Sequence, residues 1–310
     1  MNYDFAIAIS VYDKFDDVKL IVDIIRENWE GNFYIVVCSS HPDPFPGLHD
    51  SKIDKIIKID PIPLDFNNYS DKEVHLHVTL RVLDSIRKSC NECANSEAPY
   101  AMHIHADAPP LSWDGIKSLI VDMKNRNKVF AARGDGWGFY TPLTPVGLYD
   151  DMFFLFDTKY TKKINFWNFD LYDCLPHKLG IHGCLAFLFL SRIGLSKFYH
   201  YAYFEDLLHW DDSPQLKAPI GGLRPICFQP EYGFLHVHEP EFPRNLGNHL
   251  KAYYFTEYKL QKGPHLKSFL KQWFLDKNDL FDKLYQMENY YFSFFKRRGL
   301  SCTPYGRDYA

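Results

Sequence analysis

Short apolar runs alternate along the first half of the chain with stretches in which apolar residues recur every three or four positions. The runs have the length of buried strands and predict strands at residues 5–12, 32–40, 52–60, 101–107 and 128–133. The helical spacing between them predicts helices at residues 16–29, 71–90 and 113–125. Strands and helices in this alternating order predict an α/β fold, in which helices flank a mixed, mainly parallel sheet with right-handed crossovers.

The segment AMHIHADAPP at residues 101–110 brings polar side chains to the end of a predicted strand. Because side chains alternate between the two faces of a strand, His103, His105 and Asp107 are expected on one face. The two prolines that follow cannot donate ladder hydrogen bonds, so the strand should end just past Asp107. The loops after the first, second and fourth strands should meet at one edge of the sheet. Proteins of the α/β class bind their ligands at such an edge.

The pattern changes after Pro243, where long helical stretches begin. We therefore expect a catalytic domain at residues 1–243 and a helical extension at 244–310. These helices either pack on the catalytic domain or a second subunit, or lie on an anionic membrane surface, since an aromatic run and the basic residues 296–298 stand near the end. The chain lacks an apolar stretch of bilayer length and a signal-peptide pattern. We therefore expect a cytoplasmic protein. If the C-terminal helices lie on a membrane, the protein would be peripheral at the inner face of that membrane.

Composition narrows the classes of function. Of the 310 residues, 46% are hydrophobic, which is enough for a substantial core. The net charge of −4 gives no overall basic field, which argues against nucleic acid as a partner. Among the seven cysteines, Cys90 and Cys93 alone are spaced as a pair. One such pair is weak support for zinc, so reduced thiols are the expectation.

Taken in order, several segments resemble the GT-A glycosyltransferases, in particular the inverting family 2 group, over roughly residues 3–240. The segments are SVYDKFDDVKLIVDIIRE, VVCSSHPD, HIHADAP, HGCLAFLFLSR, FED and HVH. In that family a strand ends in an Asp-x-Asp motif, and an acidic pair follows about a hundred residues later. Here Asp206 stands 99 positions after Asp107, and His238 stands 32 positions after Asp206. The resemblance implies a GT-A-like fold, with HGCLAFLFLSR as a glycine-containing strand before the acidic pair.

The resemblance also implies an activity, the transfer of a sugar from a nucleotide-diphosphate donor to a hydroxyl of a glycan or lipid-linked glycan in surface polysaccharide assembly. Asp107 is the expected protein ligand of Mn²⁺ or Mg²⁺ at the donor diphosphate, and His238 is the expected second ligand, with His236 as the alternative. Asp206 is expected to act as the general base toward the acceptor hydroxyl, with Glu205 as the second choice. An acidic pair at a helix start also serves as an ordinary cap.

The donor site implied by the resemblance includes seven residues: Ser10, Tyr12, Ser39, His105, Arg133, Asp135 and Arg192. Arg192 is expected to contact the diphosphate, because guanidinium groups match phosphate oxygens, although a surface role is an alternative. Asp135 lies in a glycine-rich segment that suits either a sugar-binding loop or a plain connector. The chain departs from the family where His105 replaces the first Asp of the motif, and where Cys38, Ser39 and Ser40 replace acidic residues after the second strand. The donor base is therefore open.

Two other classes of function stay open. HIHADA nearly matches the His-x-His-x-Asp-His run of metallo-β-lactamase-like hydrolases, although Ala108 breaks it. His182, His236 and His238 could supply further zinc ligands. The third interpretation is a sugar-binding GT-A module that has lost catalysis. The departures from the family at His105 and after the second strand favour it.

Overall fold

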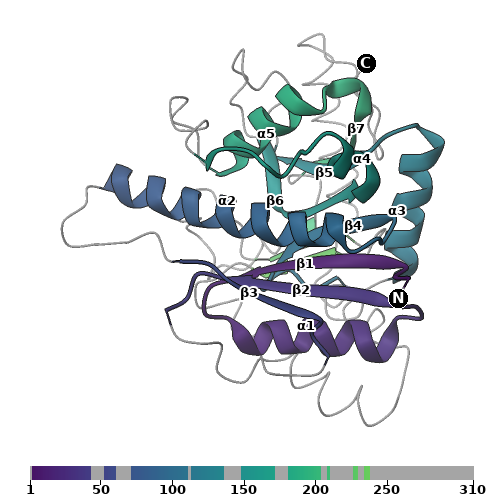
Figure 1. Cartoon of the computed structure of the whole chain (residues 1–310), viewed down its shortest axis with the longest axis horizontal. Helices are drawn as coiled ribbons and strands as arrows, with labels where there is room; N and C mark the ends of the chain where they lie inside the picture. The colour runs from purple at the N-terminus through teal and green to yellow at the C-terminus, as the bar shows by residue number, and fades with distance from the viewer. Residues whose placement is uncertain are drawn as a thin grey trace.

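The computed structural model of the chain describes residues 2–42, 52–60, 71–110, 113–135, 148–171, 181–203, 208–209, 226–229 and 234–237. Its main feature is a seven-stranded sheet in the order β3-β2-β1-β4-β6-β5-β7 (Figure 1). The strands are β1 (Phe5–Val11), β2 (Phe33–Ser39), β3 (Lys55–Lys58), β4 (Tyr100–His105), β5 (Phe130–Asp135), β6 (Leu148–Asp157) and β7 (Phe198–Tyr203). Every neighbouring pair is parallel except the two that β6 makes with β4 and β5. The expected mixed, mainly parallel sheet is confirmed and is consistent with a GT-A-like fold.

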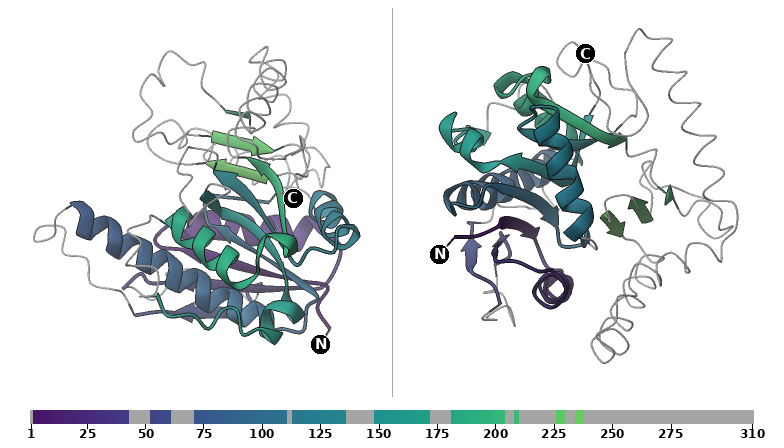
Figure 2. Two further views of the ribbon diagram at one scale, coloured as in Figure 1. Left: turned by 90° about the horizontal axis from the view of Figure 1, so that it is seen from above. Right: turned by 90° about the vertical axis from the view of Figure 1, so that its right-hand side faces the viewer.

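Helices cover both faces of this sheet (Figures 1 and 2). One face packs against α1 (Phe15–Asn28) and α3 (Trp113–Asn125), and their apolar residues share a single core cluster with the sheet. The opposite face packs against α2 (Asp71–Asn95) and α5 (Ile181–Arg192), with the short α4 (Thr158–Lys163) beside α2. Cys90 and Cys93 are free thiols buried in this second cluster. The predicted helices near residues 16, 71 and 113 are confirmed.

Strand β1 shows how the sequence builds the two faces. All seven of its residues are buried, and they alternate between the two core clusters. Phe5, Ile7 and Ile9 fill the α1/α3 face, whereas Ala6 and Ala8 face α2, whose backbone can therefore approach the sheet closely. Ser10 continues the small-residue series on the α2 face. The alternation thus delivers a hydroxyl to the end of the strand beneath α2.

Two expectations about the elements were wrong. Strand β4 ends at His105, and a turn closed by the Ala108 N–H to His105 carbonyl bond (3.0 Å) carries Asp107 away from the strand face. Aspartate suits a turn, and the turn precedes the prolines that were expected to end the strand. The segment HGCLAFLFLSR is the helix α5, not a strand. Its buried Cys184, Leu185, Leu188 and Phe189 recur at helical spacing, which a nearly continuous apolar run conceals.

A second, antiparallel sheet has the order β10-β9-β8, made of β8 (Leu208–His209), β9 (Ile226–Gln229) and β10 (Phe234–Val237). His236 lies in β10 opposite Cys227, and His238 lies just outside the described residues. The boundary expected at residue 243 and the extension at 244–310 also lie outside them. Within the described ranges, no helix is long and apolar enough to cross a bilayer.

Candidate functional site

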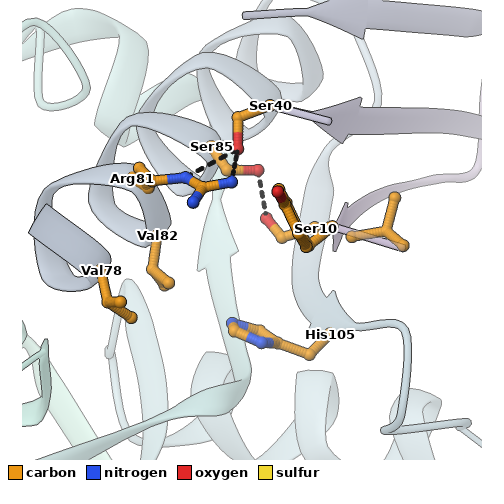
Figure 3. A pocket seen from close by; sticks show the side chains of 9 residues that line it. Ser10, Ser40, Val78, Arg81, Val82, Ser85 and His105 are labelled. Atoms are coloured by element: carbon orange, nitrogen blue, oxygen red, sulfur yellow. Dashed lines mark hydrogen bonds between the residues drawn. The ribbon is translucent and has the colours of Figure 1, made fainter. Parts of the chain in front are cut away.

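A pocket of about 320 Å³ opens at the carboxyl ends of β1 and β4, beneath α2 (Figure 3). The chain passes from β1 to β2 on one side and later places β4 on the other side of β1, so the pocket lies at the topological switch point of the sheet. Ligands of open α/β sheets bind at such points. The prediction that the loops after these strands meet at one edge is confirmed. The lining residues are Ser10, Val11, Tyr12, Ser40, Val78, Arg81, Val82, Ser85 and His105.

A chain of buried hydrogen bonds runs behind the pocket. Ser85 of α2 donates to Ser10 Oγ at 2.9 Å, and Ser10 Oγ lies 2.8 Å from His103 Nε2. The other ring nitrogen of His103, Nδ1, lies 3.0 Å from the Asp151 carbonyl oxygen. Since a carbonyl only accepts, Nδ1 carries the proton and Nε2 accepts from Ser10. Burial, with a smaller effect of the neighbouring His105, lowers the pKa of His103 well below its usual value, which keeps this imidazole neutral.

A buried carboxylate lies between two imidazoles on the same side of the sheet. Asp151 Oδ1 is 3.0 Å from His182 Nε2, and Asp151 Oδ2 is 3.3 Å from His105 Nε2, although this second contact lacks hydrogen-bond geometry. Burial alone would raise the pKa of Asp151, but the imidazoles of His105 and His182 outweigh it and hold the pKa well below its usual value. Asp151 is therefore an ionised, fully buried carboxylate directly behind a residue that lines the pocket.

The outer wall of the pocket combines an aromatic ring with a cation. The guanidinium of Arg81 lies 4.2 Å from the centre of the Tyr12 ring, and it also donates to Ser40 Oγ at 3.2 and 3.3 Å. Tyr12 is 46% exposed, and its ring also makes a T-shaped contact with the His41 ring at 5.1 Å between the ring centres. Val78 and Val82 come from the same helix as Arg81 and add apolar surface (Figure 3). This wall suits a ligand that has a planar ring and a negative charge.

An ion pair links the loops that leave β1 and β4. Lys14 Nζ lies 2.8 Å from Asp107 Oδ2, and the two side chains are 30% and 17% exposed. Each residue stands two positions beyond one that lines the pocket, Tyr12 and His105 respectively. The carboxylate that was expected to bind a metal ion is thus bonded to an ammonium group.

The structure brings together some of the expected donor-site residues. Ser10, Tyr12 and His105 line the pocket. Ser39 is buried directly behind its rim, where its hydroxyl donates to the Tyr12 carbonyl at 3.2 Å and accepts from the His41 N–H at 3.1 Å. Ser39 therefore shapes the loop that carries Tyr12.

Arg192 lies elsewhere. Its guanidinium donates to the carbonyls of Phe166 and Asn165 at 2.7 and 3.1 Å, in the segment that follows α4. Because β6 runs antiparallel to β4 and leads into α4, this segment lies at the edge where β4 begins, opposite the pocket. The contacts of Arg192 thus tie α5 to the segment after α4.

The other expected site residues lie partly or wholly outside the described part of the chain. Arg133 and Asp135 lie in the backbone of β5, and their side chains are outside the described part. Glu205, Asp206 and His238 fall outside the described residues altogether. Their predicted roles as base and metal ligand stay predictions.

The described side chains near the pocket that could bind a metal ion contact other groups of the protein, and metal binding stays a prediction. Asp107 Oδ2 is bonded to Lys14, and His105 Nε2 faces Asp151. Within the described ranges, no three His, Cys, Asp or Glu side chains converge as ligands. Under the zinc-hydrolase hypothesis, His103 is unsuitable as a zinc ligand, because its two ring nitrogens contact Ser10 Oγ and the Asp151 carbonyl oxygen.

Sequence reasoning missed Arg81 and Ser85, which line the pocket. It also missed Asp151, which lies against His105, and Lys14, which pairs with Asp107. Arg81 and Ser85 are four positions apart on α2, so polar residues next to the apolar stripe of that helix were an available signal. Asp151 stands in an acidic pair before the apolar run MFFLF, a position that suits a strand start as well as a site.

No family model matches the sequence, and no curated protein matches it either. Among solved structures, mouse xyloside xylosyltransferase 1 in its apo form is similar to this chain with a TM-score of 0.35 and 11% identity. The similarity covers 64% of this chain and 84% of that one. At this level of likeness the comparison assigns no activity, donor or acceptor.

Proposed function

We propose that this chain is a glycosyltransferase, which moves a sugar from a nucleotide-diphosphate donor to a hydroxyl of a glycan or lipid-linked acceptor. The observation that carries the proposal is the pocket at the switch point, with the Tyr12 ring and the Arg81 guanidinium on one wall and serine hydroxyls on another. The fold supports a nucleotide ligand at this edge in general terms. The sugar, the base and the surface-glycan pathway belong to the proposal.

The chemistry of a nucleotide fits these side chains. Every nucleobase has a flat face that can stack on an aromatic ring, whichever polar groups lie along the edge of the base. Tyr12 offers an exposed ring of this kind. A ribose hydroxyl can donate to Ser10 Oγ, whose own proton goes to His103, or exchange hydrogen bonds with Ser40. Arg81 supplies a fixed positive charge for an anionic ligand. Together these groups favour a nucleoside diphosphate over a neutral sugar alone.

The proposed reaction is an inverting transfer. The acceptor oxygen forms a bond to the anomeric carbon while the bond from that carbon to the diphosphate breaks, and the electron pair goes to the leaving phosphate oxygen. The acceptor hydroxyl proton passes to a carboxylate base, for which Asp206 is the proposed residue and Glu205 the second choice. General-base help of this kind contributes roughly 10² to 10⁴ in rate.

Two experiments test the proposal. A thermal-shift screen of nucleoside diphosphates and nucleotide sugars should raise the melting temperature, because a ligand that binds only the folded state stabilises it. Tyr12→Ala and Arg81→Met should reduce that shift. No shift with any of these ligands would contradict the proposal.

The base is tested with Asp206→Asn. Asparagine keeps the shape of the side chain but does not take up a proton at neutral pH, so kcat should fall at least about a hundredfold while donor affinity stays near normal. The matched variant Glu205→Gln shows which member of the pair carries the role. Full activity in both variants would remove the pair from the catalytic site, and donor binding without turnover in the unsubstituted protein would favour the binding-module reading.

A further inference from the structure

We propose that a pocket between α2 and the segment after α4 binds a carbohydrate that carries a carboxylate or a phosphate group. This pocket has a volume of about 340 Å³ and is separate from the pocket at the switch point. It lies farther along α2, toward the end of the helix that precedes β4. Its lining residues are Arg87, Lys88, Asn91, Asn165, Trp167 and Asn168. Because the two pockets have no lining residue in common, the inference does not depend on the proposed nucleotide site.

The two walls of this pocket are tied to each other. Arg87 of α2 donates to the Phe169 carbonyl at 2.9 Å and to Asp84 Oδ1 at 2.6 Å, so its guanidinium bridges the helix and the segment after α4. Arg192 of α5 donates to the Asn165 carbonyl at 3.1 Å and fixes the same segment. The pocket is therefore formed before a ligand enters, which reduces the entropy that binding costs.

Three amide side chains, those of Asn91, Asn165 and Asn168, supply the neutral polar groups of the lining. In the part of the chain that the structure describes, these amides make no hydrogen bond to the protein. An amide both donates and accepts, which matches the hydroxyl groups of a sugar. Asn165 has a left-handed backbone (φ 49°), which asparagine tolerates well, so a turn also accounts for that residue. Asn91 lies within α2, where asparagine is a weak helix former, so local structure does not account for it.

The charged residues of the lining are both cations. Arg87 and Lys88 share one carboxylate, that of Asp84, whose oxygens lie 2.6 Å from Arg87 Nη2 and 3.2 Å from Lys88 Nζ. One carboxylate offsets one of these two positive charges, and the Lys88 side chain is 42% exposed. A guanidinium beside an ammonium group suits the oxygens of a carboxylate or a phosphate.

The combination of groups selects the class of ligand. Cations alone would suit any small anion, whereas amides beside them favour an anion that also carries hydroxyl groups. Trp167 is 3% exposed, so the lining offers little aromatic surface on which a nucleobase could stack. An acidic sugar fits these groups better than a nucleotide does.

The test follows the side-chain amide signals of Asn91 and Asn168 in the intact, ¹⁵N-labelled protein. The compounds added are glucuronate, glucose 6-phosphate, glucose and inorganic phosphate. Lys88→Met removes one cation and leaves the bridge between the walls intact, and Asn168→Ala removes one amide. Lys117→Met is the matched control, since Lys117 also pairs with an aspartate of its own helix, Asp114, at 2.7 Å. Thermal melts establish that each variant is folded.

At least one acidic sugar should produce saturable shifts of both amides, and the tighter of the two shows whether the charged group is a carboxylate or a phosphate. Lys88→Met should weaken this binding about tenfold, as the loss of a charge-assisted hydrogen bond implies. Asn168→Ala should weaken it about fivefold, the usual effect of one neutral hydrogen bond. Lys117→Met should bind as the unsubstituted protein does.

Three results would overturn the proposal. The first is that neither acidic sugar shifts these amides. The second is that glucose binds as tightly as the acidic sugars, which would remove the role of the cations. The third is that inorganic phosphate binds as tightly as they do, which would mean a site for small anions and no recognition of the sugar.

Discussion

Strands β1 and β4 carry apolar side chains on one face of the sheet and polar side chains near the pocket on the other face. On the α1/α3 face, β1 and β4 present Ile7, Ile9, Met102 and Ile104, all fully buried among apolar side chains. On the α2/α5 face, the same strands present Ser10 and His103, which belong to a buried polar network. Buried polar groups cost free energy unless they are bonded, so packing alone does not favour them. The polar positions cluster toward the carboxyl ends, where the pocket opens.

The largest predicted loss of stability comes from a substitution on the apolar face. Ile7→Ala should lower the free energy of unfolding by about 2–5 kcal/mol, the usual loss for truncating a buried aliphatic side chain. Urea unfolding measures the loss. UDP or GDP affinity, measured below the melting temperature, should stay unchanged, because Ile7 faces away from the pocket. A large change in affinity without a loss of stability would break the division between the faces.

On the polar face, Asp151→Asn should lower the free energy of unfolding by about 1–3 kcal/mol, because His182 loses a charged acceptor and His105 a charged neighbour. The pH dependence sharpens this prediction. The pKa of Asp151 is lowered in the folded state, so its contribution is present above the usual carboxyl pKa of about 4 and is lost as pH falls below it.

Urea unfolding between pH 5 and pH 3 compares the two proteins. The unsubstituted protein should lose stability more steeply with falling pH than Asp151→Asn. Equal slopes would mean that Asp151 is not stabilised as an anion in the fold.

The smallest predicted effect concerns His103. Its pKa is lowered in the fold, so the unfolded chain takes up a proton near pH 6.5 that the folded protein does not. Stability should therefore decline by about 1 kcal/mol between pH 7.5 and pH 5.5, since one pKa unit is worth about 1.4 kcal/mol. His103→Gln, which retains polar groups but does not titrate, should show a smaller decline. An identical decline in both proteins would assign it to other histidines.

The sequence predicted the features that depend on local periodicity. Strands β1, β2 and β4 and helices α1, α2 and α3 follow from apolar spacing within a few residues. The pairing of β6 with β4 is a long-range feature, and it brings Asp151 next to His105 although the two are 46 positions apart. Lys14 and Asp107 are 93 positions apart and meet through the loops of two different strands. The local pattern of apolar and polar residues does not predict these long-range contacts.

Among the expected site residues, three at or just beyond the ends of β1 and β4 lie at the pocket, and their role in donor binding stays a prediction. Ser10, Tyr12 and His105 line the pocket because the ends of parallel strands meet at one edge. The expected place of Asp107 on the β4 face was wrong, because a turn begins at His105 and precedes the prolines. Arg192 was placed by analogy with a strand, and the segment is a helix whose end lies at the opposite edge.

The central claim is that the pocket beneath α2 is the nucleotide site. The most direct measurement is a titration of the ¹⁵N-labelled protein with UDP and GDP, followed through the backbone amide shifts. Saturable shifts should concentrate at Ser10, Tyr12, Arg81 and His105, with none on the apolar face at Ile7. Saturable binding that leaves the pocket residues unshifted, or no binding of either nucleotide, would contradict the claim.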